Sequence, residues 1–425
     1  MYKESRFNIL KEIDGELIIY NTVSKAFLRV KEKDVLRNAL EILNENRSDS
    51  EKYQVLIKNG FIVPADKDEV LELKYIFNKR YFNENTLSVG LMPSMACNFA
   101  CPYCFEEPYR ENKVREDYFS ILKRYAEKYF RYYNHVDVNL FGGEPLLFFD
   151  EIKDYLEYVS RLADKHKFAY SSSIITNGSL ITNEVMDVLV KHNCTSMQIT
   201  IDGSERTHDQ TRCFRGGAPS FIKLIEIINK TVGPYLNDSR LNFILRINLL
   251  NNTNEEVIEG LTRIDAGIRD RISVFFRRIY DTSCFKGNNN NSSEDYLGLL
   301  KSSEKLGFKV MYNKYFARSC EACSDTNFAY ITPDLALWKC LNAKDCGKDV
   351  GKIGQIMDDG SVTFYANRMV EWYKAANCFE NEKCLNCKQL PDCLGGCIAH
   401  CALNACSDRI CSEFNLTSLP FLYAK

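Results

Sequence analysis

The sequence has no run of 18 or more apolar residues, so it offers no segment long enough to cross a membrane as a helix. The first residues, Met1-Tyr-Lys-Glu-Ser-Arg-Phe7, also lack the apolar core of a secretion signal. An excess of charge is missing as well, because 55 basic and 57 acidic side chains leave a formal net charge of −2. We therefore expect a cytoplasmic protein that binds neither membranes nor nucleic acid.

Histidine is scarce, and the five that are present do not form a metal-ligand set. Cysteine is abundant: there are 18, and twelve of them lie between Cys320 and Cys411. Thiols stay mostly reduced in the cytoplasm, so a disulfide scaffold is not expected there. Dense cysteines in a reducing compartment are more typical of metal ligands, and their clustering predicts a separate cysteine-rich domain.

Three further cysteines lie in Cys97-Asn-Phe-Ala-Cys101-Pro-Tyr-Cys104, just after the apolar segment 87–92. Three thiolates suit a [4Fe–4S] cluster and leave one iron without a protein ligand, which a small molecule can bind. A chance cluster of cysteines or half of a zinc site is the alternative. The spacing resembles the signature of radical S-adenosylmethionine (radical SAM) enzymes. In that family SAM chelates the open iron, and the aromatic residue before the third cysteine, here Tyr103, lies beside the adenine.

Short apolar runs alternate with amphipathic segments after residue 83. This alternation predicts an α/β fold of parallel strands joined by right-handed crossovers. Six such units fit the partial (β/α)6 TIM-like barrel of the radical SAM family, in which chemistry occurs at the C-terminal ends of the strands. The expected strands are 87–92, 136–141, 170–176, 196–201, 241–249 and 273–276, and the expected helices lie near 115–131, 150–166, 182–191, 219–230 and 254–264.

Polar motifs follow these strands. Gly142-Gly143-Glu144 comes after the second strand, and its glycines let a backbone approach a ligand closely. Thr176-Asn177 ends the third strand, where Asn177-Gly178 alone would indicate only a tight turn. The resemblance implies that the first motif binds the amino group of SAM, and that the second helps to hold its ribose and carboxylate.

The fourth and fifth strands carry polar residues at alternate positions, which point to one face of a strand. We expect that face to line the barrel, where buried polar groups need a ligand or water. Arg246 is a candidate for a bidentate pair with the SAM carboxylate, with a structural salt bridge as the alternative. The candidate catalytic residues are Gln198, Asp202 and His208, and the candidate cofactor-binding residues are Tyr103, Gly142, Gly143, Glu144, Thr176, Asn177, Thr200, Arg246 and Asn248.

The cysteine-rich region contains Cys384-x2-Cys387-x5-Cys393-x3-Cys397 and resembles the SPASM domain. It departs from that pattern once, because the glycine expected five residues before Cys340 is Leu335. The resemblance implies two auxiliary [4Fe–4S] clusters, with zinc as the alternative metal. Cys320, Cys340 and Cys397 would hold the first cluster, with Cys323 as a fourth ligand or in place of Cys320; Cys384, Cys387, Cys393 and Cys411 would hold the second.

Residues 1–82 are expected to form a small domain of their own. A strand over 7–13 ends at Asp14-Gly15, a hairpin signal, and further strands are expected over 16–21 and 26–30. Two helices and a short strand at 61–64 follow. This order resembles the winged-helix-like RiPP recognition element, which holds the leader of a ribosomally made precursor peptide as an added strand. An unrelated N-terminal cap is the alternative.

The expected organisation is thus a leader-binding domain (1–82), a radical SAM barrel (83–290), a connector (291–313) and a SPASM domain (314–425). Together these resemble peptide maturases, which implies SAM, three [4Fe–4S] clusters and a reductant such as flavodoxin or ferredoxin. The implied reaction uses a 5′-deoxyadenosyl radical to abstract hydrogen from a cysteine-containing precursor peptide and form thioether crosslinks of the sactipeptide or ranthipeptide type.

Three alternatives stay open. An anaerobic sulfatase-maturating enzyme would form formylglycine, but such enzymes place an aspartate after the cysteine that corresponds to Cys340, where this chain has Leu341. Other radical SAM peptide modifications, such as carbon–carbon crosslinking or decarboxylation, are equally compatible with the domains. A non-catalytic iron–sulfur scaffold or electron carrier would not need the motifs at Gly142 and Asn177.

Overall fold

The computed structural model describes residues 1–45, 50–82, 84–104, 106, 115–250, 252–279, 293–310, 326–341, 349–396 and 398–399. These residues form two compact units. We call one the terminal unit, because it contains the chain up to Phe82 and the described residues from Tyr373 onward. The other, the sheet unit, contains the described residues from 84 to 372.

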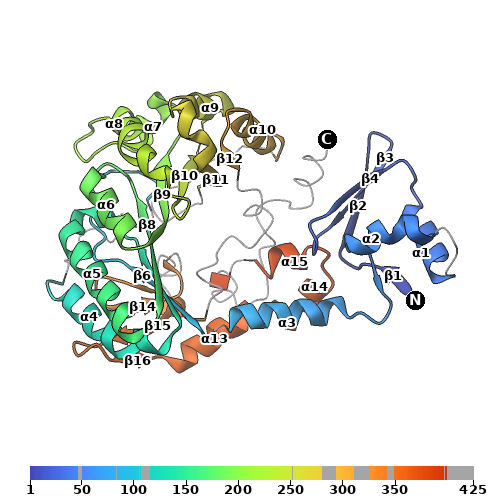
Figure 1. The fold of residues 1–425 in the computed structure, drawn as a ribbon, viewed down its shortest axis with the longest axis horizontal. Helices are drawn as coiled ribbons and strands as arrows, with labels where there is room; N and C mark the ends of the chain where they lie inside the picture. The colour runs from blue at the N-terminus through green and yellow to red at the C-terminus, as the bar shows by residue number, and fades with distance from the viewer. Residues whose placement is uncertain are drawn as a thin grey trace. The chain divides into compact units, whose positions relative to one another are not determined.

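A large sheet with helices along it forms the sheet unit (Figure 1). Seven neighbouring strands are parallel and follow one another across the sheet in chain order. These strands are β6 (Thr86–Leu91), β7 (His135–Leu140), β8 (Ala169–Thr176), β9 (Cys194–Ile201), β10 (Asn242–Leu249), β11 (Ile272–Arg278) and β12 (Lys309–Val310).

A helical segment connects each strand of this series to the next, as parallel pairing requires. The prediction of an α/β fold is therefore confirmed. The helices are α4 (Tyr118–Tyr129), α5 (Phe149–His166), α6 (Asn183–Lys191), α7 (Glu205–Thr211), α8 (Phe221–Glu226), α9 (Asn254–Thr262) and α10 (Ser293–Lys305), with the shorter turns η3 (Phe130–Tyr132), η4 (Pro145–Phe148), η5 (Ile227–Val232, a π-helix), η6 (Gly233–Asn237) and η7 (Ala266–Arg271).

The two faces of the sheet differ in polarity because residues alternate along each strand. On β7, Val136 and Val138 are fully buried, whereas Asp137 and Asn139 are only half-buried. The polar side chains bond to one another across strands: Ser171 Oγ of β8 donates to Asp137 Oδ1 at 2.7 Å. The apolar face supplies the core, and the polar face is left for other contacts.

Four more strands extend the sheet beyond β6. Strand β13 (Phe328–Ile331) pairs with β6 in parallel, and β14 (Ala336–Trp338), β15 (Lys352–Ile356) and β16 (Val362–Phe364) continue it in antiparallel order. The sequence interpretation named none of these strands. Residues 326–372 therefore group with the parallel strands, and they include Cys340, directly after β14.

The turn between β13 and β14 explains the departure from the SPASM pattern at Leu335. This residue has φ +62°, a backbone region that glycine adopts without strain and leucine rarely does. Its side chain is fully buried, and its N–H donates to Thr332 O at 2.8 Å. The turn thus keeps the left-handed conformation that a glycine would favour, and burial of the leucine side chain offsets the strain.

A three-stranded antiparallel sheet dominates the terminal unit. Its core lies between β3 and the helix α1, where Leu17 and Ile19 pack against Leu36 and Ala39. The chain then enters α3, whose first turn is capped by the Asp68 side chain. The elements are β1 (Tyr2–Glu4), β2 (Asn8–Ile13), β3 (Glu16–Asn21), β4 (Phe27–Val30), α1 (Val35–Asn44), η1 (Ser50–Tyr53), α2 (Gln54–Lys58), β5 (Ile62–Pro64) and α3 (Glu69–Tyr81).

Short helices follow in the C-terminal part of the chain. They are η9 (Asp349–Gly351), α13 (Ala366–Ala376), η10 (Cys378–Glu380), α14 (Glu382–Leu385) and α15 (Leu390–Cys393). Four of the predicted cluster ligands, Cys320, Cys323, Cys397 and Cys411, lie outside the described residues. Within the part of the chain that the structure describes, no helix is long and apolar enough to span a membrane.

Candidate active site

The candidate site residues gather where the parallel strands end. Because β6 to β10 are parallel, the loops that follow them emerge at one edge of the sheet. Cys97 comes after β6, Gly142 after β7, Asn177 after β8 and Asp202 after β9. The strand order thus brings together motifs that are up to about a hundred residues apart in the chain.

The three-cysteine loop packs around aromatic side chains. Cys101 is buried, and Cys97 and Cys104 are half-buried beside Phe99 and Tyr103. Burial raises the pKa of the Cys101 thiol to about 12, although the nearby guanidinium of an arginine opposes the shift. Because metals bind the thiolate, cluster assembly here must release a proton.

No group of three or more Cys, His, Asp or Glu side chains converges on a single metal-ion position among the residues described. A four-iron cluster does not require such convergence, because each thiolate binds a different iron. What the cluster needs is three thiols on one loop, and Cys97, Cys101 and Cys104 provide them.

A segment after α7 holds this cysteine loop in place. The N–H of Ala100 donates to Cys213 O at 3.0 Å, and the N–H of Arg215 donates to Asn98 O at 2.8 Å. The Arg215 side chain also donates from Nε to Cys97 O at 2.9 Å. The sequence interpretation missed this clamp, because no local pattern predicts pairing across more than a hundred residues.

The Gly142-Gly143 pair lies against the start of the same loop. The N–H of Gly143 donates to Ser94 O at 3.1 Å, and the N–H of Glu144 donates to Ala96 O at 2.9 Å. A Cβ atom on Gly143 would lie 2.2 Å from Ala96 O, and Gly142 adopts φ +121°. Both positions therefore require glycine, here for close packing of one backbone on another.

The Glu144 carboxylate ties the ends of β7 and β8 together. It accepts from Thr176 Oγ1 at 2.7 Å and from the N–H of Asn177 at 2.7 Å. It is almost fully buried, so desolvation raises its pKa, while the bond from the Asn177 N–H opposes that effect. The carboxylate thus orients Asn177 toward the cysteine loop.

Asn177 connects this carboxylate to the first cysteine. Its Nδ2 donates to Asn98 Oδ1 at 2.7 Å and lies 3.8 Å from Cys97 Sγ. Asn98 in turn donates to Ser179 Oγ at 2.9 Å. Asn98 and Ser179 were absent from the predicted site, and their only sequence signal is adjacency to predicted residues.

A second network forms around the Tyr103 hydroxyl. It donates to Asp202 Oδ2 at 2.5 Å and accepts from Arg212 at 2.9 Å and from Asn248 Nδ2 at 3.1 Å. All four residues are buried. Burial raises the pKa of Asp202, and the Arg212 charge lowers it. The structure therefore brings Tyr103, Asp202 and Asn248 together, with Arg212 as the cation that the candidate list lacked.

Arg246 lies on β10 beside this network. Its Nε donates to Asn248 Oδ1 at 2.8 Å, and among the described residues it has no carboxylate partner in an ion pair. Burial and the neighbouring charge of Arg277 lower its pKa to about 10. A half-buried arginine without an ion-pair partner among the described residues can gain stability from an added anion such as a carboxylate.

Gln198 and Thr200 lie on β9, where Thr200 is paired in register with Arg246. Thr200 is buried and Gln198 is half-buried. Their alternate positions put both on the face of the sheet that also carries Arg246. Gln198 lies nearer the start of the strand, and Thr200 lies nearer its C-terminal end.

His208 is fully buried within α7. Its Nδ1 accepts from the Asp202 N–H at 3.2 Å, and its Nε2 lies 3.0 Å from Ser220 Oγ, which donates to Arg212 O at 2.6 Å. Burial, followed by the Arg212 charge, lowers the pKa of His208 well below its usual value. A neutral ring with both nitrogens engaged favours positioning of Asp202 over contact with a substrate.

The four predicted auxiliary-cluster ligands that the structure describes, Cys340, Cys384, Cys387 and Cys393, are half-buried. The N–H of Cys387 donates to Cys384 O at 3.0 Å, so this pair spans a single turn. Beyond Cys393 the backbone takes positive φ at Leu394, and then at the two glycines that follow. This reversal redirects the chain directly after the third cysteine of the quartet.

Comparison with known proteins identifies the domain to which this site belongs. Residues 91–263 match the model of the Radical SAM superfamily. The chain contains a radical SAM domain. That domain includes the three-cysteine loop, the Gly142-Gly143 pair, Asn177 and both networks described above.

Longer similarities extend beyond this domain. The radical SAM cyclopropyl synthase TigE of Paramaledivibacter caminithermalis is 22% identical over 430 residues, covering 93% of this chain and 87% of TigE. Similar folds occur in anSMEcpe with bound AdoMet and the Kp18Cys peptide (TM-score 0.56, 18% identity, 80% of this chain and 95% of that one). They also occur in Streptococcus suis SuiB bound to its precursor peptide SuiA (TM-score 0.50, 16% identity, covering 94% of this chain and 96% of SuiB).

The radical SAM domain has the residues that a cluster and SAM require. Three thiols lie on one loop, and two buried polar atoms beside them, Asp202 Oδ1 and Arg212 Nε, have no hydrogen-bond partner within the described structure. Unsatisfied buried groups are costly, so a ligand that bonds to them is strongly favoured. SAM carries amino, carboxylate, hydroxyl and adenine groups that can do so.

Gly143→Ala is expected to remove the cluster of the radical SAM domain. The new Cβ would overlap the carbonyls of Met95 and Ala96, so the chain leading into Cys97 must move. We expect anaerobically reconstituted protein to lose about four irons per chain, the content of one [4Fe–4S] cluster. Iron and sulfide analysis measures the loss.

Gly267→Ala is the matched control, because an added Cβ there meets no atom within 4 Å. It should keep the full iron content. Equal iron in both variants would show that the glycine contact does not hold the cysteine loop.

Proposed function

We propose that this chain modifies a ribosomally made precursor peptide by radical SAM chemistry and joins a precursor cysteine to a carbon atom of another residue as a thioether. The observation that supports a peptide substrate is the extent of the structural similarity. The similarity to SuiB in complex with its precursor spans 94% of this chain, so it extends well beyond residues 91–263. Similarity to TigE over 93% of the chain supports the same class of enzyme.

In this proposal Cys97, Cys101 and Cys104 hold the cluster that binds SAM. When bound, this pair supplies a 5′-deoxyadenosyl radical that takes a hydrogen atom from a carbon of the peptide. Arg246 would pair with the SAM carboxylate, and Tyr103 would lie beside the adenine. Thr176, Asn177, Thr200 and Asn248 line the same edge of the sheet.

Two auxiliary [4Fe–4S] clusters complete the proposed cofactor set. The first would take Cys320, Cys340 and Cys397, with Cys323 as a fourth ligand or in place of Cys320, and the second would take Cys384, Cys387, Cys393 and Cys411. Their proposed role is to accept the electron left on the substrate when the C–S bond forms. Reduced flavodoxin or ferredoxin would supply the electron that cleaves SAM, and its oxidised form would take the substrate electron back from the auxiliary cluster.

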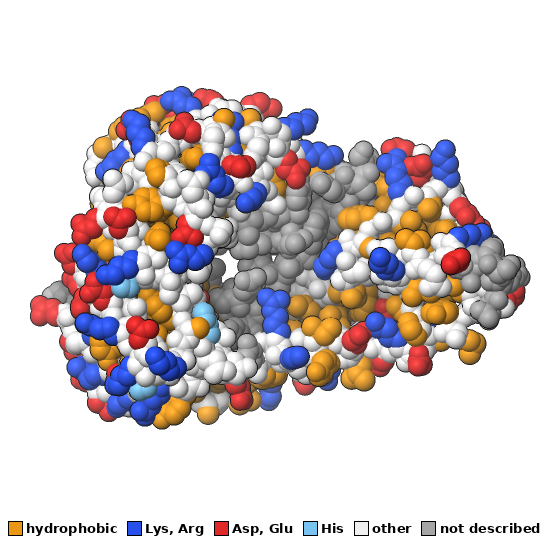
Figure 2. All heavy atoms as spheres, viewed as in Figure 1, with side chains coloured by type: hydrophobic (Ala, Val, Ile, Leu, Met, Phe, Trp, Pro, Cys, Tyr) orange, Lys and Arg blue, Asp and Glu red, His pale blue; other side chains and the backbone are white. Residues whose placement is uncertain are grey.

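The terminal unit is proposed to hold the leader of the precursor. Among the residues described, β2 and β4 are the edges of its three-stranded sheet, and an edge can accept an extended peptide as an added strand. Hydrophobic side chains show on the surface of this unit (Figure 2). On the two edge strands, Leu10 of β2 is 43% exposed and Phe27 of β4 is 40% exposed.

The test is anaerobic turnover of a short cysteine-containing peptide encoded beside the gene, with SAM and dithionite. Forming a C–S bond from one S–H and one C–H removes two hydrogens, so each crosslink should lower the peptide mass by about 2 Da. The linked cysteine should also resist alkylation by iodoacetamide. Full alkylation of every cysteine after turnover would contradict thioether formation.

A second candidate is closure of a carbon–carbon bond within the precursor. The similarity to TigE, named a cyclopropyl synthase, favours it specifically. Such closure also removes two hydrogens, but both come from carbon, and every cysteine stays open to alkylation. The alkylation arm of the same experiment therefore distinguishes the two products.

A further inference from the structure

The central strand of the terminal unit is buried on both faces. Leu17 and Ile19 face the helices, whereas Ile18 and Tyr20 belong to a separate apolar cluster with Ile13. Ile18 and Tyr20 are each only 1% exposed. The face of β3 away from the helices is thus a contact surface inside this unit, and the residues that bond to it show which segment it holds.

The turn after β3 is built by one asparagine. Asn21 Oδ1 accepts from the N–H groups of Val23 and Ser24 at 3.0 and 2.9 Å. Its Nδ2 donates to Asn8 Oδ1 at 2.8 Å and to Gly60 O at 2.9 Å. This bonding fixes the turn and supports the left-handed backbone of Lys25, at φ +61°.

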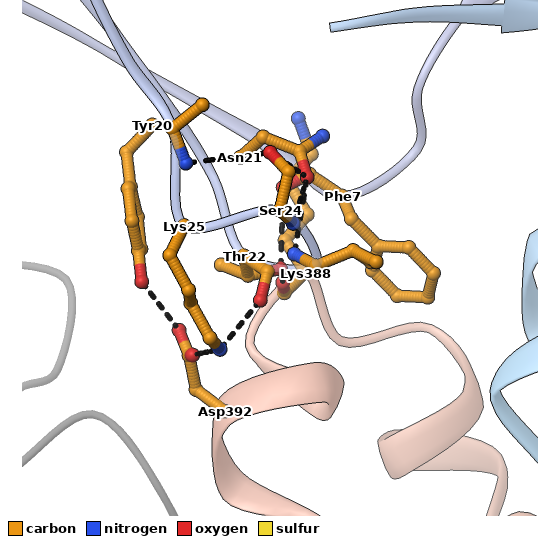
Figure 3. A network of polar contacts seen from close by, with 10 residues as sticks. Phe7, Tyr20, Asn21, Thr22, Ser24, Lys25, Lys388 and Asp392 are labelled. Carbon is orange, nitrogen blue, oxygen red and sulfur yellow. Dashed lines mark hydrogen bonds and ion pairs between the residues drawn. The ribbon is translucent and has the colours of Figure 1, made fainter. Parts of the chain in front are cut away.

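The turn reaches the cysteine-rich segment at two points (Figure 3). Thr22 Oγ1 donates to Lys388 O at 2.7 Å, and Lys25 forms an ion pair with Asp392. Tyr20 OH donates to the other oxygen of Asp392 at 3.4 Å. Outside the turn, an arginine before β2, Arg6, donates to Leu385 O at 2.5 Å.

These contacts fall between the predicted ligands of the second auxiliary cluster. Leu385 lies between Cys384 and Cys387, and Lys388 and Asp392 lie between Cys387 and Cys393. The first two spacings of the ligand set, Cys384 to Cys387 and Cys387 to Cys393, are therefore each held by a contact from the first 25 residues. The ligand segment has little regular structure of its own, since its helices α14 and α15 have only four residues each.

Asp392 makes the contact that restricts the ligand segment most. Its side chain is 1% exposed, whereas Lys25 is 41% exposed. A buried carboxylate without a cation is strongly destabilising, so the ligand segment favours the position in which Lys25 and Tyr20 reach it. The ion pair thus specifies where the segment lies, in addition to any stability that it adds.

We propose that Lys25 and Tyr20 are positioning residues for the second auxiliary cluster: by holding Asp392 they set the spacing of Cys387 and Cys393. The inference rests on the auxiliary cluster of the proposed function and goes beyond it. Since the same hairpin leads into the edge strand β4, the proposed leader-binding sheet and the cluster form one assembly. Coupling is reciprocal, so the cluster must also stabilise the hairpin.

The test uses the variant Cys97→Ala/Cys101→Ala/Cys104→Ala, in which all remaining iron belongs to the auxiliary sites. Adding Lys25→Glu should lower iron from about eight to about four per chain, the loss of one cluster. It should also remove one electron paramagnetic resonance signal of the reduced protein. Lys25→Arg keeps the charge and should keep both clusters.

Lys33→Glu is the matched control, because Lys33, which follows β4, pairs with Glu12 of β2 and both side chains are more than 50% exposed. It should leave the iron unchanged. The double exchange Lys25→Glu/Asp392→Lys should recover part of the iron lost in Lys25→Glu, which guards against simple misfolding of the hairpin.

The reciprocal arm measures hydrogen exchange at residues 20–26 with and without Cys384→Ala/Cys387→Ala. Loss of the cluster should speed exchange there. Unchanged iron in Lys25→Glu, or unchanged exchange in the cysteine variant, would overturn the coupling. Absence of iron from the starting triple variant would overturn the auxiliary clusters themselves, so the two failures are distinguishable.

Discussion

Replacing Cys97, Cys101 and Cys104 together with alanine is expected to abolish formation of 5′-deoxyadenosine from SAM. Without the thiolates, no cluster is held at the end of β6, and no electron can enter SAM. The proposed function includes one SAM-binding and two auxiliary [4Fe–4S] clusters. Iron in reconstituted protein should therefore fall from about twelve to about eight per chain. Anaerobic iron analysis and chromatography of the nucleoside measure both effects.

Cys194→Ala is the matched control for this experiment. Cys194 is buried at the start of β9, distant in sequence from both cysteine motifs, and its removal deletes only a small apolar side chain. It should keep all the iron and the activity. A fall from about four irons to none in the triple variant, with zinc present, would contradict the auxiliary clusters and make the C-terminal cysteines a zinc site.

The parallel strands were predictable because their patterns are local. The expected strand over 136–141 is β7 at His135–Leu140, and the expected strand over 170–176 is β8 at Ala169–Thr176. In both segments the apolar residues either alternate or form a short continuous run, and helices of ordinary length flank them. The spacing of the apolar residues and the length of the segment therefore both indicate a strand. Seven-residue α7 was missed, since it is too short to show a helical period.

The sheet extension was not predictable from pattern alone. Strands β13, β14 and β16 have only three or four residues each. Strand β13 pairs with β6 across some 240 residues of chain, Phe328 opposite Ser88. Nothing local in the sequence specifies such a partner. The cysteines around these strands also favoured an interpretation as metal ligands, so strand pairing was not considered there.

The sequence predicted the site residues that belong to a recognisable motif. It did not predict those whose role depends on contacts with distant parts of the chain. Gly143 and Asn177 were found through family resemblance. Asn98, Arg215 and Arg212 entered only with the structure, because each acts by a hydrogen bond to a residue far along the chain. A buried carboxylate such as Asp202 demands a cation, but the sequence cannot indicate which arginine supplies it.

Arg212→Met is expected to destabilise the sheet unit strongly. Asp202 is 1% exposed, and the Arg212 charge, which bonds to the same Tyr103 hydroxyl, is the cation that most lowers its pKa. Without Arg212 a buried negative charge would lose this compensation, which we expect to cost about 3–5 kcal/mol in free energy of unfolding. Both tryptophans of the chain, Trp338 and Trp372, lie in this unit, so their fluorescence during urea unfolding of the cluster-free protein reports on it.

Two further variants decide whether buried charge is the cause. Asp202→Asn/Arg212→Met removes both charges and should recover a large part of the lost stability, because no unpaired carboxylate is then buried. Arg240→Met breaks a pair with Asp238 at the surface and should change the midpoint little. If Arg212→Met were as mild as Arg240→Met, Asp202 would have to be reached by water, and the Tyr103 network could not be a dry, charge-balanced network.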